Sequence, residues 1–168
     1  MKIMKFGGTS VGTPERMRSI VDLINKDEKV IVVLSAMSGT TNALLEISGM
    51  LFSGDNAAAA TKIESLRKRY HDVINELFEK KDTKRQASGI VDEHFNFISD
   101  FLNGIFSKMH EKIIVSRGEI ISTTLFYLLL QEMNIKSALI SALNFMRIDK
   151  YGEPDLFYIT ENLNRELN

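Results

Sequence analysis

The sequence contains no cysteine and only three histidines among its 168 residues. The absence of cysteine excludes disulfides, thiol nucleophiles and cysteine-ligated metal sites. His71, His94 and His110 stand far apart in the sequence, without the close spacing of zinc ligands. We therefore expect no metal site built from protein side chains.

An excess of charge and long apolar runs are also missing. Lysine and arginine total 21 against 22 aspartates and glutamates, a net charge of −1, which argues against nucleic-acid or acidic-membrane partners held by bulk electrostatics. No apolar run approaches the length of a membrane span, and the N-terminus lacks a signal-peptide architecture. The hydrophobic fraction of 44% is ordinary for a globular protein. We expect a cytoplasmic domain with one core.

Residues 5–12 read Lys-Phe-Gly-Gly-Thr-Ser-Val-Gly and join an apolar, strand-like stretch to a Thr-Pro pair that is typical of a helix start. Adjacent glycines let the backbone approach a ligand closely. Successive N–H groups before a helix N-terminus form a concave anion site, to which Thr9 and Ser10 add hydroxyls and Lys5 a positive charge. The pattern matches neither the P-loop nor the dinucleotide fingerprint. It indicates a phosphate site, with a plain turn as the alternative.

A second segment of the same kind follows the next expected strand. Residues 13 to about 25 have the spacing of an amphipathic helix, and residues 30–34 form a β-branched run typical of a buried parallel strand. This strand, helix and strand predict a right-handed βαβ unit. Residues 35–42, Ser-Ala-Met-Ser-Gly-Thr-Thr-Asn, then precede a helix expected from residue 42 or 43. In open α/β sheets ligands bind at the carboxyl ends of the strands, so residues 5–12 and 35–42 should lie together. A Ser/Thr-rich helix cap is the alternative.

Residues 55 to about 106 carry no strand signal. Apolar residues at helical spacing predict two amphipathic helices with a polar break at residues 81–84. Charges of both signs alternate on them, which is typical of a solvated helix face. We expect a helical hairpin insert (about 55–108) packed beside the sheet, with no chemistry of its own.

A third segment, Ser-Arg-Gly-Glu at residues 116–119, precedes a strongly helical stretch. Residues 111–115 before it are ambiguous between strand and helix. If the helix begins at residues 116–119, Glu119 lies near its start. There the carboxylate either interacts with the helix dipole or is held as a fixed acceptor for an ammonium group.

The remaining sequence predicts shorter elements. Residues 137–141 indicate a third strand, 142–147 a short helix or buried loop, 149–154 an exposed turn and 156–160 another strand. Residues 161–167 begin a helix. A helix of barely two turns, with no strand after it, is an unusual end for a domain. We therefore expect a truncated sequence.

Taken together, three segments resemble the aspartokinases of the amino-acid-kinase superfamily. They are Lys-Phe-Gly-Gly-Thr-Ser-Val at 5–11, Val-Leu-Ser-Ala-Met-Ser-Gly-Thr-Thr-Asn at 33–42 and Ser-Arg-Gly-Glu-Ile-Ile-Ser at 116–122. The resemblance spans nearly the whole chain, residues 1–168, but only the N-terminal part of that family's catalytic domain. It implies an α/β fold, a truncated parallel-sheet αβα sandwich of the amino-acid-kinase type with a helical hairpin insert. The C-terminal nucleotide-binding part and the ACT domains would be absent.

The resemblance also implies a reaction. The family phosphorylates the side-chain carboxylate of L-aspartate with ATP, whose Mg²⁺ travels with the nucleotide. The product, 4-phospho-L-aspartate, begins lysine, threonine and methionine biosynthesis. The family's later Gly-Arg-Gly-Gly-Ser-Asp segment is missing from this chain, so we expect the chain alone to be inactive and the complete enzyme to be a homo-oligomer.

The roles that the resemblance assigns fall into two groups. Lys5 would be the catalytic cation, neutralising the transferred phosphoryl group, and with it the phosphate-binding residues would be Gly7, Gly8, Thr9 and Ser10. The substrate-binding residues would be Ser35 and Thr41, which line the aspartate pocket, and Glu119, which accepts from the α-ammonium group. Arg117 receives no role.

Two alternatives stay open. Another amino-acid kinase, acting on N-acetylglutamate or glutamate, would share the fold, but the Ser-x-x-x-Gly-x-Thr-Asn and Ser-x-Gly-Glu segments argue against it. A non-catalytic binding scaffold would have no need of Lys5 or Glu119, and both are present.

Overall fold

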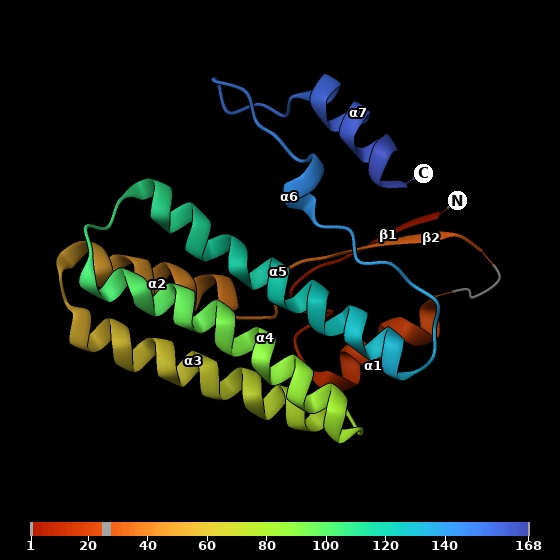
Figure 1. Cartoon of the computed structure of the whole chain (residues 1–168), viewed down its shortest axis with the longest axis horizontal. Coiled ribbons are helices and arrows are strands. Elements are labelled where there is room, and N and C mark those ends of the chain that lie inside the picture. The colour runs from red at the N-terminus through yellow and green to blue at the C-terminus, as the bar shows by residue number, and fades with distance from the viewer. Residues whose placement is uncertain (1, 25–27, 168) are drawn as a thin grey trace. The chain divides into compact units, whose positions relative to one another are not determined.

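The computed structural model describes residues 2–24 and 28–167 and divides into two units, Met1–Ser137 and Ala138–Asn168. The described residues of the first unit form two strands and six helices and include most of the buried residues (Figure 1). Its elements are β1 (Lys2–Phe6), α1 (Pro14–Leu23), β2 (Val30–Leu34), α2 (Thr40–Ser53), α3 (Asn56–Leu77), α4 (Lys81–Ser99), the 3₁₀ helix η1 (Asp100–Asn103) and α5 (Lys108–Glu132). The second unit holds α6 (Ala142–Phe145) and α7 (Leu156–Leu167).

The predicted βαβ unit is present at the N-terminus. β1 and β2 pair in parallel, from Lys2 opposite Val30 to Phe6 opposite Leu34, with α1 between them in the chain. Thr13 caps α1, its hydroxyl accepting from the backbone N–H of Arg16 (3.4 Å). The prediction of a buried β2 was wrong.

The exposure of the strands follows from the size of the sheet. Among the described residues the sheet has two strands, so neither strand is flanked on both sides. Ile3 is 66% and Val33 44% exposed, while Leu34 is the buried residue of β2. The α/β class is therefore confirmed, in a form that is mostly helical with a small parallel sheet.

The main core lies among four helices. α3 packs against α2 and α4, and α5 packs against the same two helices, which gives a four-helix arrangement (Figure 1). The side chains at its centre are fully buried and apolar; they include Leu44, Ile47, Ile63, Ile74, Val91, Phe95, Ile114 and Ile121. The predicted hairpin of α3 and α4 exists, but its apolar faces are covered by α2 and α5. The expectation that it packs beside the sheet was therefore wrong.

Two connections differ from their predicted positions by a few residues. The turn between α3 and α4 lies at residues 78–80 rather than 81–84, and α2 begins at Thr40 rather than at residue 42 or 43. The turn at 78–80 is held by the carboxylate of Glu132, which accepts from the backbone N–H groups of Glu79 (2.9 Å) and Lys80 (3.0 Å). This ties the end of α5 to the tip of the hairpin.

α5 is longer than the sequence indicated. It begins at Lys108, where Ser107 and His110 form a reciprocal capping box, and residues 111–115 are helical. By length and hydropathy α5 would be able to cross a membrane, which corrects the expectation that no apolar stretch reaches that length. Here it is a central helix of the bundle, packed against α2, α4 and β2.

In the second unit both predicted strands were wrong. Residues 138–141, like Ser137 before them, form no strand with any described residue, because an extended segment needs a neighbouring strand as partner. Residues 156–160 belong to α7, which starts where Asp155 Oδ1 accepts from the N–H of Tyr158 (3.0 Å). The predicted short helix (α6) and the turn at 149–154 are confirmed, the latter with Gly152 at φ 87°.

Candidate active site

Residues 7–12, which we call the glycine turn, connect β1 to α1. Ser10 N and Val11 N both donate to the carbonyl oxygen of Gly7 (2.9 and 3.3 Å), and Arg16 donates to the carbonyl oxygen of Thr9 (2.7 Å). Within the described part of the chain, the N–H groups of Gly8 and Thr9 make no hydrogen bond. Backbone donors at the end of a strand and before a helix are therefore available to an anion.

This turn lies directly against the second segment. A Cβ on Gly8 would stand 2.9 Å from the carbonyl oxygen of Ala36, and one on Gly12 would stand 3.0 Å from Ser38 Cβ. Ser35 N donates to the carbonyl oxygen of Phe6 (3.1 Å) and continues the parallel pairing into the loop. The prediction that residues 5–12 and 35–42 share one edge of the sheet is confirmed. Glycine at positions 8 and 12 is explained by this contact.

The third segment reaches the same place from α5. A Cβ on Gly118 would stand 2.8 Å from Ala36 Cβ and 3.1 Å from Thr40 Cγ2. Four residues later Ser122, which is fully buried, donates its hydroxyl hydrogen to the carbonyl oxygen of Ser35 (2.7 Å). Residues 35–41, which we call the substrate loop because the sequence analysis expects Ser35 and Thr41 to bind substrate, are thus held between the glycine turn and α5.

The proposed site residues are distributed over these three segments. Lys5 is exposed on β1. The glycine turn exposes Gly7, Thr9 and Ser10, and the partly buried site residues are Gly8, Ser35, Thr41 and Glu119. The backbone segments that carry these residues are brought together, and the contacts of each side chain with a ligand stay predictions.

Glu119 does not lie at a helix N-terminus. It stands about three turns into α5, which begins at Lys108, and the helix dipole acts mainly within the first and last turns. The dipole interpretation of Glu119 is therefore wrong. The sequence misplaced this residue because residues 111–115, which extend the helix, are ambiguous in local pattern.

Two residues of the helical insert contact the substrate loop, and the sequence analysis missed both. A guanidinium nitrogen of Arg69 donates to the carbonyl oxygen of Ser38 (2.6 Å). The hydroxyl oxygens of Tyr70 and Thr40 lie 3.0 Å apart, buried, and either can donate. A tyrosine on an apolar helix stripe was the available signal, because a buried tyrosine hydroxyl usually has a hydrogen-bond partner.

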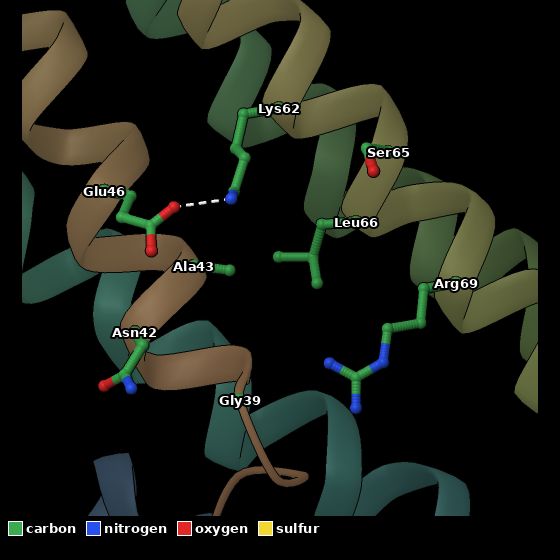
Figure 2. Close-up of a pocket in the computed structure, with 8 residues that line it drawn as sticks. All are labelled: Gly39, Asn42, Ala43, Glu46, Lys62, Ser65, Leu66 and Arg69. Carbon is green, nitrogen blue, oxygen red and sulfur yellow. Dashed lines mark ion pairs between the residues drawn. The ribbon is translucent and has the colours of Figure 1, made fainter.

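Arg69 also lines a pocket of about 280 Å³ between α2 and α3, beside the substrate loop. Figure 2 shows its guanidinium at one end of the pocket, with Lys62 and Glu46 at the other. Lys62 and Glu46 pair with each other at 2.5 Å. The charges at that end of the pocket are therefore balanced within the protein.

Arg117, inside the third segment, packs against α4. Its guanidinium carbon lies 4.1 Å from the centre of the Phe97 ring, and one of its nitrogens lies 3.3 Å from Nδ1 of His94. Burial lowers the pKa of Arg117. Burial, followed by the neighbouring positive charge of Arg117, lowers the pKa of His94. Residues 2–24 and 28–167 contain no group of three or more acidic or histidine side chains placed to hold a metal ion.

Comparison with known proteins places this arrangement in a family. The model of the Amino acid kinase family matches residues 1–167. The chain is 32% identical to Aspartokinase 2, chloroplastic, of Arabidopsis thaliana, over 94% of this chain and 30% of that protein. It is 30% identical to Lysine-sensitive aspartokinase 3 of Escherichia coli (strain K12), over 95% of this chain and 35% of that protein. The chain thus spans about a third of the length of these relatives.

Solved structures agree on the fold. E. coli aspartokinase III in complex with lysine and aspartate (T-state) superposes with a TM-score of 0.80 at 24% identity, over 99% of this chain and 38% of that one. The same enzyme in complex with aspartate and ADP (R-state) gives 0.78 at 23% identity, over 99% and 37%. Because the family model covers the chain almost from end to end, this protein belongs to the amino acid kinase family.

Proposed function

We propose that this protein is part of an aspartate kinase, which transfers the γ-phosphoryl group of ATP to the side-chain carboxylate of L-aspartate and forms 4-phospho-L-aspartate. The observation that carries the proposal is the meeting of three segments at Ala36, which Gly8 approaches from one side and Gly118 from the other. Relatives with about 30% identity over 94–95% of the chain are aspartokinases. The reaction would supply amino-acid biosynthesis, in the cytoplasm, from a homo-oligomeric enzyme.

The glycine turn is suited to the phosphate groups of ATP. The N–H groups of Gly8 and Thr9, which have no partner among the described residues, and the exposed hydroxyls of Thr9 and Ser10 offer donors at one edge of the sheet. Lys5, on the adjoining strand, would neutralise charge on the phosphoryl group during transfer. Phosphoryl transfer depends on positioning and on positive charge more than on covalent chemistry, which is what this segment offers.

The substrate loop and Glu119 are suited to an amino acid. The hydroxyls of Ser35 and Thr41 would bind the aspartate, and the Glu119 carboxylate would accept from its α-ammonium group in a charge-assisted hydrogen bond. Glu119 follows Gly118, which packs against Ala36 and Thr40 of the loop. As Glu119 has no role at a helix terminus, substrate binding accounts for a partly buried carboxylate at this place.

ATP would bring its own Mg²⁺. The described residues hold no three-ligand metal cluster, and the phosphate oxygens are themselves ligands that Mg²⁺ prefers. E. coli aspartokinase III has been solved with aspartate and ADP, and we propose that this protein takes the same two classes of ligand.

An ADP-release assay with several acceptors tests the proposal. The protein expressed from its complete coding sequence should release ADP with MgATP and L-aspartate, and far more slowly with glutamate or N-acetylglutamate. Release with either of those two acceptors and none with aspartate would overturn it. The 168-residue chain by itself should show no turnover near the ordinary enzyme value of about 10 s⁻¹, because it lacks the Gly-Arg-Gly-Gly-Ser-Asp segment.

A further inference from the structure

The helical insert is attached to the substrate loop on both sides of Gly39. Arg69 donates to the carbonyl oxygen of Ser38 (2.6 Å), and the hydroxyl of Tyr70 contacts that of Thr40 (3.0 Å). Gly39 between them has φ 79°, a backbone conformation that other residues rarely adopt. Two consecutive residues of α3 therefore contact the sharpest point of the loop.

The contact between Tyr70 and Thr40 is buried and joins two hydroxyl groups. Each of the two residues is only 1% exposed, and within the described chain each hydroxyl has the other as its hydrogen-bond partner. The Tyr70 ring packs on Phe95 with ring centres 5.6 Å apart. A phenylalanine would fill the same space, so the hydroxyl is not needed for packing. A buried hydroxyl pair is costly to leave half satisfied, which fixes the position of Thr40.

This contact stands at the junction of the loop with α5. Thr40 touches Gly118, as the 3.1 Å between Thr40 Cγ2 and a Cβ built on that glycine shows. Thr41 follows Thr40 in the sequence, and Glu119 follows Gly118 on α5. Burial raises the pKa of Tyr70 to about 12, although the hydrogen bond with Thr40 and the charge of Arg69 oppose this effect. Tyr70 therefore stays a neutral hydrogen-bonding group at physiological pH.

We propose that Arg69 and Tyr70 are positioning residues: they fix residues 38–40 so that Ser35 and Thr41 are held in place opposite Glu119. The helical insert thereby controls the affinity for the amino-acid substrate, without touching that substrate itself. This inference rests on the proposed function for its kinetic consequence, whereas its structural part, the ordering of the substrate loop, does not depend on any activity.

Hydrogen exchange tests the structural part. Tyr70→Phe is compared with Tyr127→Phe, which removes a partly buried hydroxyl from α5 that has no hydrogen-bond partner in the described chain. In the protein expressed from its complete coding sequence, Tyr70→Phe should speed exchange of the Thr40 and Ala43 amides by about fivefold or more, since they donate to Met37 and Gly39 and local opening controls exchange. Exchange of residues 7–12 should not change. Equal protection of residues 37–43 in both variants and the wild type would overturn the proposal.

Kinetics tests the consequence for binding. Tyr70→Phe should raise KM for aspartate by roughly fivefold, the typical effect of one hydrogen bond, and leave KM for ATP unchanged. Thr40→Val combined with Tyr70→Phe should add little to either single change, because both remove the same contact. Arg69→Met should act in the same direction.

The outcomes separate the two claims. If Tyr70→Phe lowers the melting temperature but leaves the aspartate KM unaltered, the contact between Tyr70 and Thr40 contributes to stability only. That result would overturn the positioning proposal. A wild-type protein that releases no ADP with aspartate would instead reject the proposed function. The exchange rates of residues 37–43 would then decide by themselves whether α3 orders the loop.

Discussion

Two side chains of opposite charge, Lys5 and Glu119, give the proposed site its electrostatic character. Lys5 is exposed on β1, at the edge where the glycine turn begins, and Glu119 is partly buried in the middle of α5. An exposed cation on a long side chain is suited to a charge that develops during the reaction. A carboxylate fixed by a helix is suited to a charge that the bound substrate already carries. The two residues should therefore affect different kinetic constants.

Lys5→Met should lower kcat far more than it raises KM for ATP. The transferred phosphoryl group needs the lysine charge most in the transition state, and loss of one such contact typically costs about a hundredfold or more in kcat. Steady-state kinetics of the protein from its complete coding sequence measures this. Lys2→Met, on the same exposed strand, is the matched control. A Lys5→Met variant with the wild-type kcat would show that Lys5 is an ordinary surface lysine.

Glu119→Gln should raise KM for aspartate by about tenfold or more, because a hydrogen bond to a charged group is worth roughly 1.5–3 kcal/mol. KM for ATP should move little, since the phosphates would bind at the glycine turn. Glu111→Gln removes a carboxylate from the first turn of α5 and serves as control. An unchanged aspartate KM, accompanied by a lower melting temperature, would contradict the substrate-binding role of Glu119.

At the scale of single elements, close backbone packing decides the geometry of the site. α5 approaches the substrate loop so closely that no side chain fits at Gly118, where a Cβ would meet Ala36 at 2.8 Å. The loop in turn leaves no room at Gly8. Small residues therefore set the distances between the three segments, and the hydroxyl of Ser122 adds a fixed hydrogen bond to Ser35.

Gly118→Ala should lower the free energy of unfolding by about 1–3 kcal/mol, the usual cost of forcing an extra methyl group into a packed core. It should also raise KM for aspartate, because Ala36 or α5 has to move. Gly89→Ala is the control: it lies in α4 with nothing within 4 Å of an added Cβ. That change should stabilise the helix by roughly 0.5–1 kcal/mol. Denaturant unfolding of both variants gives the comparison, and equal stability in the two would refute the tight contact at Gly118.

The sequence predicted some of these elements well because their signals are local. A strand, a glycine turn, a Thr-Pro cap and a helix follow one another in residues 2–23, and all are present. The meeting of residues 5–12 with 35–42 also followed from parallel pairing alone. The start of α5 was missed because a short apolar run such as Ile113-Ile114-Val115 fits a strand or a helix equally well. Residues 156–160, which were predicted as a strand, are helical, and the same ambiguity explains this wrong prediction.

Other features needed the three-dimensional structure. The partner of Tyr70 is 30 residues away in sequence and that of Arg69 is 31 away, and no periodicity indicates which helix faces which loop. The four-helix arrangement was likewise not predictable. The apolar stripes of α3 and α4 indicate that each helix has a buried face, but not that α2 and α5 cover it. The ligand contacts of the eight site residues stay predictions.

At the scale of the whole molecule, the larger unit, Met1–Ser137, is held together by side-chain contacts at two places. The substrate loop leads into α2 and contacts both α3 and α5. At the turn between α3 and α4, Glu132 of α5 accepts from the backbone, and Arg18 of α1 donates to the carbonyl oxygens of Glu76 (2.6 Å) and Leu77 (2.8 Å) at the end of α3. These contacts join helices that are distant in sequence.

Glu132 should make the stability of the protein depend on acid pH. Burial opposes its ionisation, but hydrogen bonds from the N–H groups of Glu79 and Lys80 outweigh this effect and hold the pKa of Glu132 below its usual value. A lowered carboxyl pKa in the folded state stabilises the protein above the unfolded-state pKa of about 4.3. This contribution is lost as the pH falls through the folded-state pKa.

Glu132→Gln should therefore lower the free energy of unfolding at pH 7 by about 1 kcal/mol or less, as expected for partly exposed hydrogen bonds. The difference from wild type should shrink below about pH 4. Denaturant unfolding at several pH values measures it, with Glu79→Gln, an exposed carboxylate on the same turn, as control. A difference that persists unchanged at pH 3 would contradict the assigned ionisation.

We propose that the three segments around Ala36 form a site that phosphorylates the side-chain carboxylate of aspartate. An acyl phosphate reacts with hydroxylamine, so the product can be trapped as a hydroxamate and the modified carboxylate identified by mass spectrometry. With MgATP, L-aspartate and the protein from its complete coding sequence, we predict a hydroxamate on the side-chain carboxylate, at a rate that falls sharply in Lys5→Met. Absence of this aspartyl hydroxamate, or formation of the corresponding product from glutamate or N-acetylglutamate instead, would contradict the account.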